Sequence, residues 1–379
     1  MQVYIHYPYC ATLCPYCDFF STTADEDPGY QASARKELAI WSRFLEGPVT
    51  SIYFGGGTPG RMAPSLCAAL IADVDKRFGL SSSAEITLET NPDDVTEQGI
   101  RDFLAAGVNR LSMGVQSLDD EELKMLGRRH DSASAIAAVA AARAAGVENL
   151  SLDLIFGLPN QSESGLKTML ERFFALQVEH VSLYGLTIEE GTQFGVDLAA
   201  GRFTELERAS WLRMYDLVAD AASSHGLERY EISNFARPGR CSRHNRSYWR
   251  DGNFVAIGPG AHGQRRLKNG GLQRRFNPRS VKGWRAAVES WDKAGEFAPH
   301  EELSPESWLR EACMVGLRDL RLGIDPQGWA RSFNLADETL MATVKRLVEC
   351  GDLSAVAPHR LLSKAMHRVD AVAAELLNA

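Results

Sequence analysis

The chain has 379 residues, of which 45% are hydrophobic and 24% are charged, and its formal net charge is −8. This is the composition of an ordinary globular protein, and the length suffices for one large domain and a smaller one. The acidic balance argues against general nucleic-acid binding, and the lack of an apolar run of about 18 residues excludes a transmembrane helix.

Short apolar runs alternate with helical patterns over the first 190 residues. The runs predict six strands, and the segments between them predict five helices. We expect strands at 3–6, 51–54, 85–90, 110–116, 149–156 and 180–186, and helices at 30–44, 64–77, 96–106, 132–145 and 164–176. This alternation predicts a parallel sheet with crossover helices, which with six strands can close partly into a (β/α)6 barrel. The site of such a fold lies at the carboxyl ends of the strands.

The pattern changes beyond residue 200. A long helix is predicted at 205–223, and residues 237–271 are rich in Gly, Arg and Asn. A small, mainly helical, winged-helix-like domain is predicted near the end, with helices at 306–318, 326–333, 337–350 and 364–377 and a hairpin at 353–362. Because the chain is acidic, we expect this domain to serve packing or docking rather than DNA binding. The predicted division is a barrel at 1–235, a connecting region at 236–300 and the helical domain at 301–379.

Three cysteines follow the first predicted strand. Cys10, Cys14 and Cys17 have the spacing C-x3-C-x2-C. Thiolates are the ligands of iron–sulfur clusters, and three thiolates on a four-iron cluster leave one iron open for a small molecule. A closed zinc site needs a fourth ligand, for which His6 is the nearby candidate, and a chance grouping is the third reading. The lack of a signal segment before the first strand predicts a cytoplasmic protein. In that compartment the cysteine thiols stay reduced.

Polar or glycine-rich motifs stand at the ends of the later strands. Residues 55–59 read Gly-Gly-Gly-Thr-Pro, and glycines let a backbone approach a ligand closely, although a tight connection gives the same pattern. Glu89 either holds a cationic or hydroxyl group of a ligand or is an acid at a helix N-terminus. Asp153 lies in an apolar strand and needs a partner, either a ligand hydroxyl or an internal arginine. All of these positions fall where a parallel α/β fold has its site.

The cysteine spacing resembles the signature of the radical S-adenosylmethionine (SAM) superfamily, in which an aromatic residue such as Tyr16 precedes the third cysteine. More widely, the chain is similar to oxygen-independent coproporphyrinogen III oxidase and its relatives over essentially its whole length. The blocks that carry the resemblance are YIHYPYCATLCPYCDF, YFGGGTP, LETNPD, RLSMGVQS, LGRRH, DLIFGLP and IGPGAHG.

This resemblance implies a radical SAM barrel with a [4Fe-4S] cluster on Cys10, Cys14 and Cys17, whose open iron chelates SAM. It also implies that SAM is contacted by Tyr4, Gly56, Gly57, Thr58, Glu89, Gln116, Arg128 and Asp153. The choice of Arg128 rather than Arg129 follows from its spacing to Gln116.

Two departures separate the chain from the oxidase and make it resemble the heme chaperone branch of the family. Phe19 stands where the oxidase has a fourth cysteine, and only nine residues precede Cys10. The run from His244 to Trp249 contains H-N-x-x-Y-W, a motif associated with heme in that branch. Imidazole is a common axial ligand of heme iron, and Tyr248 and Trp249 can stack on a porphyrin. The alternative is that these aromatic residues belong to a core and that His244 caps a loop.

The resemblance therefore implies a heme chaperone that carries a SAM-ligated cluster and passes heme to apo-hemoproteins, with respiratory hemoproteins as candidates. Self-association as a homodimer stays open. The alternative functions are a radical SAM enzyme, acting on coproporphyrinogen III or as a methyltransferase, and a redox sensor that uses the cluster without SAM cleavage.

Overall fold

The computed structural model describes residues 1–250, 252–332, 335, 337–357, 360–363 and 368–379. Among these residues, twelve strands form one sheet. Their order across the sheet is β12 (Glu301–Leu303), β11 (Leu272–Phe276), β10 (His262–Arg266), β9 (Phe254–Ile257), β1 (Gln2–Tyr7), β2 (Val49–Gly56), β3 (Leu80–Thr90), β4 (Arg110–Gln116), β5 (Leu150–Phe156), β6 (His180–Gly185), β8 (Asn234–Ala236) and β7 (Glu228–Arg229).

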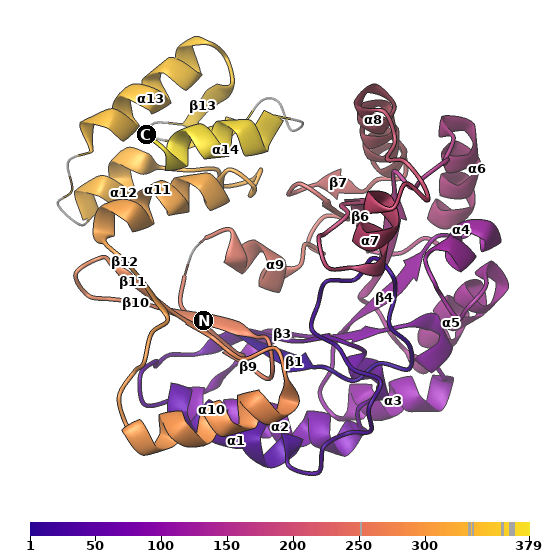
Figure 1. The fold of residues 1–379 in the computed structure, drawn as a ribbon, viewed down its shortest axis with the longest axis horizontal. Coiled ribbons are helices and arrows are strands. Elements are labelled where there is room, and N and C mark those ends of the chain that lie inside the picture. The colour runs from indigo at the N-terminus through magenta and orange to yellow at the C-terminus, as the bar shows by residue number, and fades with distance from the viewer. Residues whose placement is uncertain (251, 333–334, 336, 358–359, 364–367) are drawn as a thin grey trace.

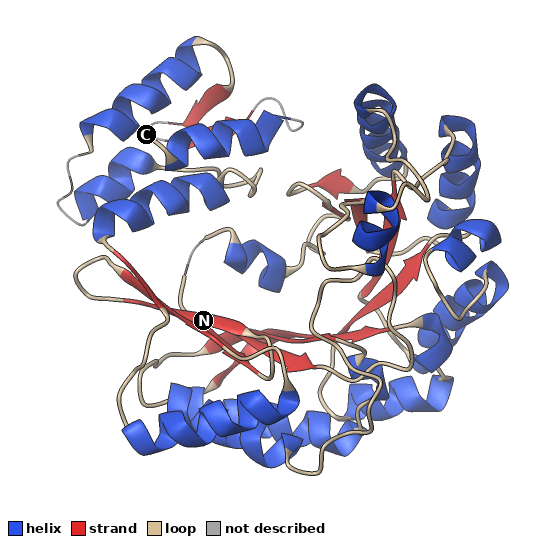
Figure 2. Ribbon diagram, viewed as in Figure 1, coloured by secondary structure: helices blue, strands red, loops and turns tan. Residues whose placement is uncertain are grey.

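Strands β1 to β6 are parallel neighbours, as the sequence predicts. Helices connect them on one side of the curved sheet (Figures 1 and 2). These helices are α1 (Tyr30–Trp41), α2 (Pro64–Phe78), α3 (Glu97–Ala105), the short α4 (Asp120–Met125), α5 (Ser132–Ala145) and α6 (Glu163–Phe174), and α7 (Gln193–Ala199) and α8 (Arg208–Ser224) follow β6. Side-chain caps fix where five of these helices begin. Each cap accepts a hydrogen bond from a backbone N–H of the first turn, and the caps are Thr96, Asp119, Asp131, Ser162 and Thr192.

The parallel strands alternate between apolar and polar side chains. Residues such as Ile5, Leu88 and Leu152 pack under the helices in the main hydrophobic core. The residues between them point to the opposite side, which we call the inner face. Its members include Tyr4, His6, Ser51, Tyr53, Glu85, Thr87, Glu89, Arg110, Ser112, Ser151, Asp153, His180 and Ser182. The period of two thus gives the sheet one apolar and one polar face.

The predicted connecting region belongs to the main sheet. Strand β9 pairs in parallel with β1, and β10 and β11 continue the sheet as antiparallel strands. Helix α10 (Val281–Ala294) packs against α1 through Tyr30 and Trp284, whose ring centroids are 5.3 Å apart. The predicted domain boundaries at 235 and 300 stay a prediction, but they do not mark the edges of the sheet.

A second hydrophobic cluster lies in the last part of the chain and includes Trp308, Leu347 and Leu376. This C-terminal unit consists of α11 (Pro305–Gly316), α12 (Pro326–Ser332), α13 (Glu338–Glu349), the hairpin strands β13 (Leu353–Ala357) and β14 (Arg360–Ser363), and α14 (Val369–Leu377). The last residue of the predicted helix 326–333, the turn of the predicted hairpin and residues 364–367 of the predicted last helix lie outside the described residues. Among those described, no helix is both long and apolar enough to cross a membrane.

Glu37 of α1 binds the segments that follow β9 and β11 and the first turn of α10. Its buried carboxylate accepts hydrogen bonds from Gly258 N, Asn277 Nδ2 and Trp284 Nε1 at 2.7–3.0 Å.

We expect Glu37→Ala to lower the free energy of unfolding by at least about 3 kcal/mol, because three buried donors lose their acceptor. Denaturant unfolding measures this, and Glu46→Ala on the exposed loop after α1 is the control, expected to change stability by less than about 0.5 kcal/mol. Equal stability of the two variants would contradict the assigned role of Glu37.

Candidate cofactor-binding site

A cavity of about 650 Å³ opens at the carboxyl ends of the parallel strands. Ligand pockets of proteins commonly measure roughly 300–1,000 Å³. Its walls come from the loop after β1 and from the ends of β2 to β6. The lining residues include Cys10, Cys14, Cys17, Phe19, Tyr53, Gly56, Gly57, Thr58, Glu89, Asn91, Ser112, Gln116, Arg128, Asp153 and Tyr184. The structure thus brings together at this cavity all but two of the residues predicted from sequence, Tyr4 and His244.

The three cysteines share one loop. Cys10 N donates to Thr22 O at 2.9 Å, which closes the base of the loop, and Cys17 N donates to Cys14 O at 3.2 Å. Burial raises the pKa of Cys10 and raises that of Cys17 to about 11. A thiolate is costly in such surroundings without a cation to bind, so this donor set fits a metal cluster. Among the described residues, no three His, Cys, Asp or Glu side chains converge as ligands of a single ion.

The glycine run after β2 lies directly beside this loop. Gly56 has a φ of 108°, and a Cβ on Gly57 would lie 2.6 Å from the backbone carbon of Pro8 and 3.0 Å from Cys10 Sγ. Only glycine allows this close approach. Thr58 Oγ1 lies 3.5 Å from Cys10 Sγ. The turn therefore brings backbone groups of the β2 end into the cavity next to the cysteines.

Two carboxylates lie in the cavity wall. Glu89 ends the inner face of β3 and accepts a hydrogen bond from the Tyr53 hydroxyl at 2.6 Å. Burial raises the pKa of Glu89 to about 7, and it also raises the pKa of Asp153 on β5. Ser112 Oγ donates to Asp153 at 3.4 Å. A ligand with cationic and hydroxyl groups would give both carboxylates the partners that they need.

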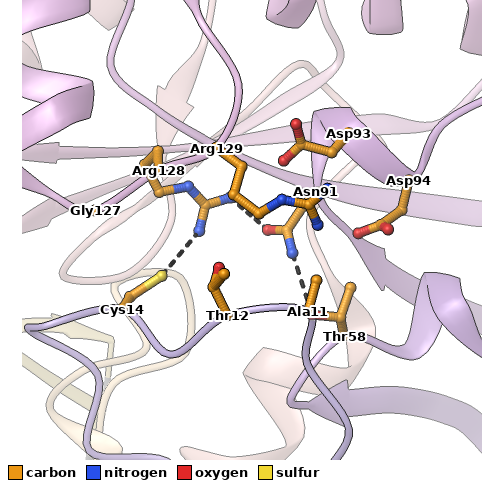
Figure 3. A pocket seen from close by; sticks show the side chains of 10 residues that line it. All are labelled: Ala11, Thr12, Cys14, Thr58, Asn91, Asp93, Asp94, Gly127, Arg128 and Arg129. Atoms are coloured by element: carbon orange, nitrogen blue, oxygen red, sulfur yellow. Dashed lines mark hydrogen bonds between the residues drawn. The ribbon is translucent and has the colours of Figure 1, made fainter. Parts of the chain in front are cut away.

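Arg128 reaches from the end of α4 to the cysteine loop (Figure 3). Its Nη1 lies 3.4 Å from Cys14 Sγ, and its Nη2 donates to Gly114 O at 2.8 Å and to Asn91 Oδ1. Asn91 Nδ2 in turn donates to Thr58 Oγ1 at 3.1 Å. Arg129 lines a small side pocket with Arg128 but is not among the lining residues of the main cavity. This placement favours Arg128, the residue chosen from sequence.

Gln116 ends β4 with a φ of 67°, in the left-handed region. A side chain other than glycine rarely adopts this conformation, and such strain concentrates at functional positions. The register between β4 and β5 shifts at the same point, between Gly114 and Gln116. The strain and the bulge together turn Gln116 into the cavity wall.

Tyr4 and His244 lie deeper on the inner face. His244 belongs to the short helix α9 (Arg243–Tyr248), which rests on the inner face opposite α1 and α2 (Figure 1). Only 1% of its surface is exposed, and its Nδ1 and Nε2 are hydrogen-bonded to Ser51 Oγ and to the Tyr248 hydroxyl, both at 3.1 Å. Its ring stacks on Tyr53 with centroids 4.9 Å apart, and burial lowers its pKa to about 3. Tyr4 is hydrogen-bonded to His6 Nδ1 at 3.1 Å.

Sequence reasoning missed several inner-face residues at or near the cavity. Tyr53, Asn91, Ser112 and Tyr184 line it, and Arg110 is buried beneath it. The two-residue period of a strand finds Tyr53, Arg110, Ser112 and Tyr184. Each of these lies an even number of residues from another inner-face residue of its own strand. Tyr53 shares a face with Ser51, and Arg110 and Ser112 share a face with Gln116.

Comparison with known proteins places this site in a family. The model of the radical SAM superfamily matches residues 4–173. The heme chaperone HemW of Bacillus subtilis is 32% identical over 355 residues, which cover 92% of this chain and 92% of that protein. HemW of Escherichia coli is 35% identical over 309 residues, 78% of this chain and 81% of that protein. The mitochondrial radical S-adenosyl methionine domain-containing protein 1 of Danio rerio is 35% identical over 337 residues, 86% and 74% of the two chains.

Among solved structures, coproporphyrinogen III oxidase (HemN) of Escherichia coli superposes with a TM-score of 0.80 at 18% identity, covering 99% of this chain and 89% of that chain. At this identity the likeness bears on the fold alone. It confirms the predicted α/β radical SAM fold with its parallel strands.

The cysteine loop generates a direct prediction. Cys14→Ser should prevent reconstitution of a four-iron cluster, because a hydroxyl does not replace a thiolate ligand. Iron and sulfide content, together with the visible absorbance, measure this. Cys350→Ser removes an exposed thiol of the C-terminal unit instead and should reconstitute like the unchanged protein. A full cluster in Cys14→Ser would show that the ligand assignment is wrong.

Proposed function

The chain belongs to the radical SAM family that includes the HemW heme chaperones, and from this premise we propose that it is itself a heme chaperone with a SAM-ligated [4Fe-4S] cluster. In this role the protein holds heme and passes it to apo-hemoproteins. The observation that carries the proposal is the 32% identity with the heme chaperone of Bacillus subtilis over 92% of both chains. The cavity with its three cysteines supports the cluster part of the proposal.

Within this proposal, Cys10, Cys14 and Cys17 hold three irons of the cluster. When bound, the cluster supplies an open iron for SAM and an electron for reductive SAM cleavage. The backbone at Gly56 and Gly57, beside the cysteines, approaches SAM closely. The remaining contacts come from side chains of the cavity wall, namely Thr58, Glu89, Gln116, Arg128 and Asp153. Tyr4 does not line the cavity and its hydroxyl is hydrogen-bonded to His6 Nδ1, so its contact with SAM stays a prediction from the resemblance.

We assign heme coordination to His244. Burial keeps its imidazole neutral, the form that binds iron. In the described conformation both ring nitrogens are engaged, by Ser51 and by Tyr248. Coordination therefore requires that the Tyr248 hydroxyl release Nε2 and that α9 expose the ring to a porphyrin. In this proposal the His244 ring is buried in the heme-free protein, which we call the closed state, and it becomes accessible when heme binds.

The test is a hemin titration of the reconstituted protein, followed at the Soret band, with His244→Ala and His180→Ala as a matched pair. His180 is also buried on the inner face with both nitrogens hydrogen-bonded, to Ser151 and to Tyr230. We expect one saturable heme per chain, at least tenfold weaker binding in His244→Ala (about 1.4 kcal/mol), and unchanged binding in His180→Ala.

Equal loss of heme affinity in both histidine variants would show that disruption of the inner face, and not loss of a ligand, is responsible. Non-saturating binding by the unchanged protein would reject the chaperone role. It would favour a radical SAM enzyme, whose signature is 5′-deoxyadenosine formed with a candidate porphyrinogen.

Tyr248→Phe tests the closed state of the motif. This change removes the hydroxyl that occupies His244 Nε2 and keeps the aromatic ring. One hydrogen bond contributes about 0.5–1.5 kcal/mol, so heme should bind roughly twofold to tenfold more tightly. Tyr215→Phe, which removes a hydroxyl near Ile232 O on the outer side, is the control and should leave affinity unchanged. Weaker heme binding in Tyr248→Phe would contradict a closed state held by this bond.

The proposed partners are heme and apo-hemoproteins, with no nucleic acid, because the net charge is −8. We propose a cytoplasmic location, where the cysteine ligands stay reduced. Homodimer formation is tested in the same preparations by light scattering with and without cluster.

A further inference from the structure

Arg110 is a buried cation that no described carboxylate pairs with directly. It is the first residue of β4, points to the inner face and is 2% exposed. Its Nε has no hydrogen-bond partner, and within the described part of the chain its guanidinium forms neither a hydrogen bond nor an ion pair. An isolated buried charge costs several kcal/mol unless nearby opposite charges compensate it. The position therefore needs an explanation beyond packing.

The strand register places Arg110 beneath the two carboxylates of the cavity. Arg110 pairs with Thr87, and two residues further along, Ser112 pairs with Glu89. On the other side Gly114 pairs with Asp153. Two residues of strand rise about 7 Å, a distance that an arginine side chain on the same face spans. Burial raises the pKa values of both carboxyls. Hydrogen bonds from Tyr53 and from the Gly56 backbone lower the pKa of Glu89, and a hydrogen bond from Ser182 lowers that of Asp153. The charge of Arg110 lowers both pKa values in addition.

The described tyrosines and histidines near these groups on the inner face are neutral. Burial raises the pKa values of the tyrosines around Glu89, which stay neutral: Tyr4, Tyr53, Tyr184 and Tyr248. His180 and His244 both lie near Arg110. Burial lowers their pKa values most, and the charge of Arg110 lowers them further, so both imidazoles are neutral. At the cavity, the charge of Glu89 raises the pKa of Cys17, and the charge of Arg128 lowers the pKa of Asp153.

We propose that Arg110 is a positioning residue whose buried charge allows Glu89 and Asp153 to ionise in the cavity wall, where they receive the cationic and hydroxyl groups of SAM. This inference rests on the proposed SAM site. Arg110 does not touch the ligand. It fixes the charge state of the two groups that do.

The first measurement is SAM affinity as a function of pH for the reconstituted protein. Because each carboxyl must be deprotonated to bind a cation, affinity should rise as the pH rises through about 7, the pKa of Glu89. In Arg110→Met the same rise should occur about one pH unit higher, so affinity at pH 7 falls about fivefold and recovers at about pH 9. Arg110→Lys keeps the charge and should restore the original profile.

The second measurement needs no cofactor. Isotope-edited infrared titration of the cluster-free protein follows the carboxyl protons directly, with Glu89→Gln and Asp153→Asn assigning the bands. We expect higher protonation midpoints in Arg110→Met and in Arg110→Gln. Arg143→Met removes an arginine that pairs with Glu179 away from the cavity and should change neither titration nor affinity.

The outcomes separate the two proposals. If the unchanged protein binds no SAM at any pH, the proposed SAM site fails, whereas the infrared titration still tests Arg110. If Arg110→Met binds SAM with the original pH profile, or loses affinity equally at every pH, the inference about Arg110 is overturned. Unchanged carboxyl midpoints in both Arg110 variants overturn it as well.

Discussion

The polar inner face of the parallel sheet is the constraint on which the rest of the site depends. Every second side chain of β1 to β6 must point away from the helices, and here many of these side chains are charged or can hydrogen-bond. Buried polar groups need partners. Glu85 finds them in α9, accepting hydrogen bonds from Arg243 N and His244 N, each at 3.0 Å. Helix α9, which carries the H-N-x-x-Y-W run, is therefore held by the polar face and satisfies its buried carboxylate.

Helix α9 is also held from its other side by the C-terminal unit, which lies above it in Figure 1. Arg246 forms an ion pair with Asp319, which is 1% exposed, at 3.0 Å. Arg318 lies over the ring of Trp249, 5.7 Å from its centroid. His244 thus faces the sheet, while Arg246 and Trp249 of the same motif face the C-terminal unit. In the proposed function, exposure of this run to a porphyrin requires that both contacts break, so the C-terminal unit would stabilise the closed state.

Sequence patterns predicted the six parallel strands and the position of the cavity, because βα alternation and the carboxyl-end rule are properties of the local chain. They missed β9, which has only four residues, and they missed β10 and β11, because the Gln and Arg residues of these two strands are not typical of strands and pairing makes them strands. They also treated β3 to β6 as apolar runs and so overlooked Arg110. Asp153 was expected to need a partner, either a ligand hydroxyl or an internal arginine. In the structure it accepts a hydrogen bond from Ser112, and the charges of Arg110 and Arg128 lower its pKa against the larger effect of burial, while a ligand contact stays a prediction. The burial of His244 depends on contacts with Ser51, 193 residues away in sequence, which no local pattern reveals.

Strand β3 carries two carboxylates on its inner face, and each of them has a different contact. Glu85 binds the N-terminus of α9, and Glu89, four residues later, lies in the cofactor cavity and is joined through the Tyr53 hydroxyl to the ring that stacks on His244. The cavity and the proposed heme site at His244 are thus separated by one layer of side chains. Any free energy of coupling between them must be reciprocal. In the proposed function, SAM in the cavity and heme at His244 therefore change each other's affinity by the same factor. Removal of heme by an acceptor would return the affinity for SAM to its value in the heme-free protein.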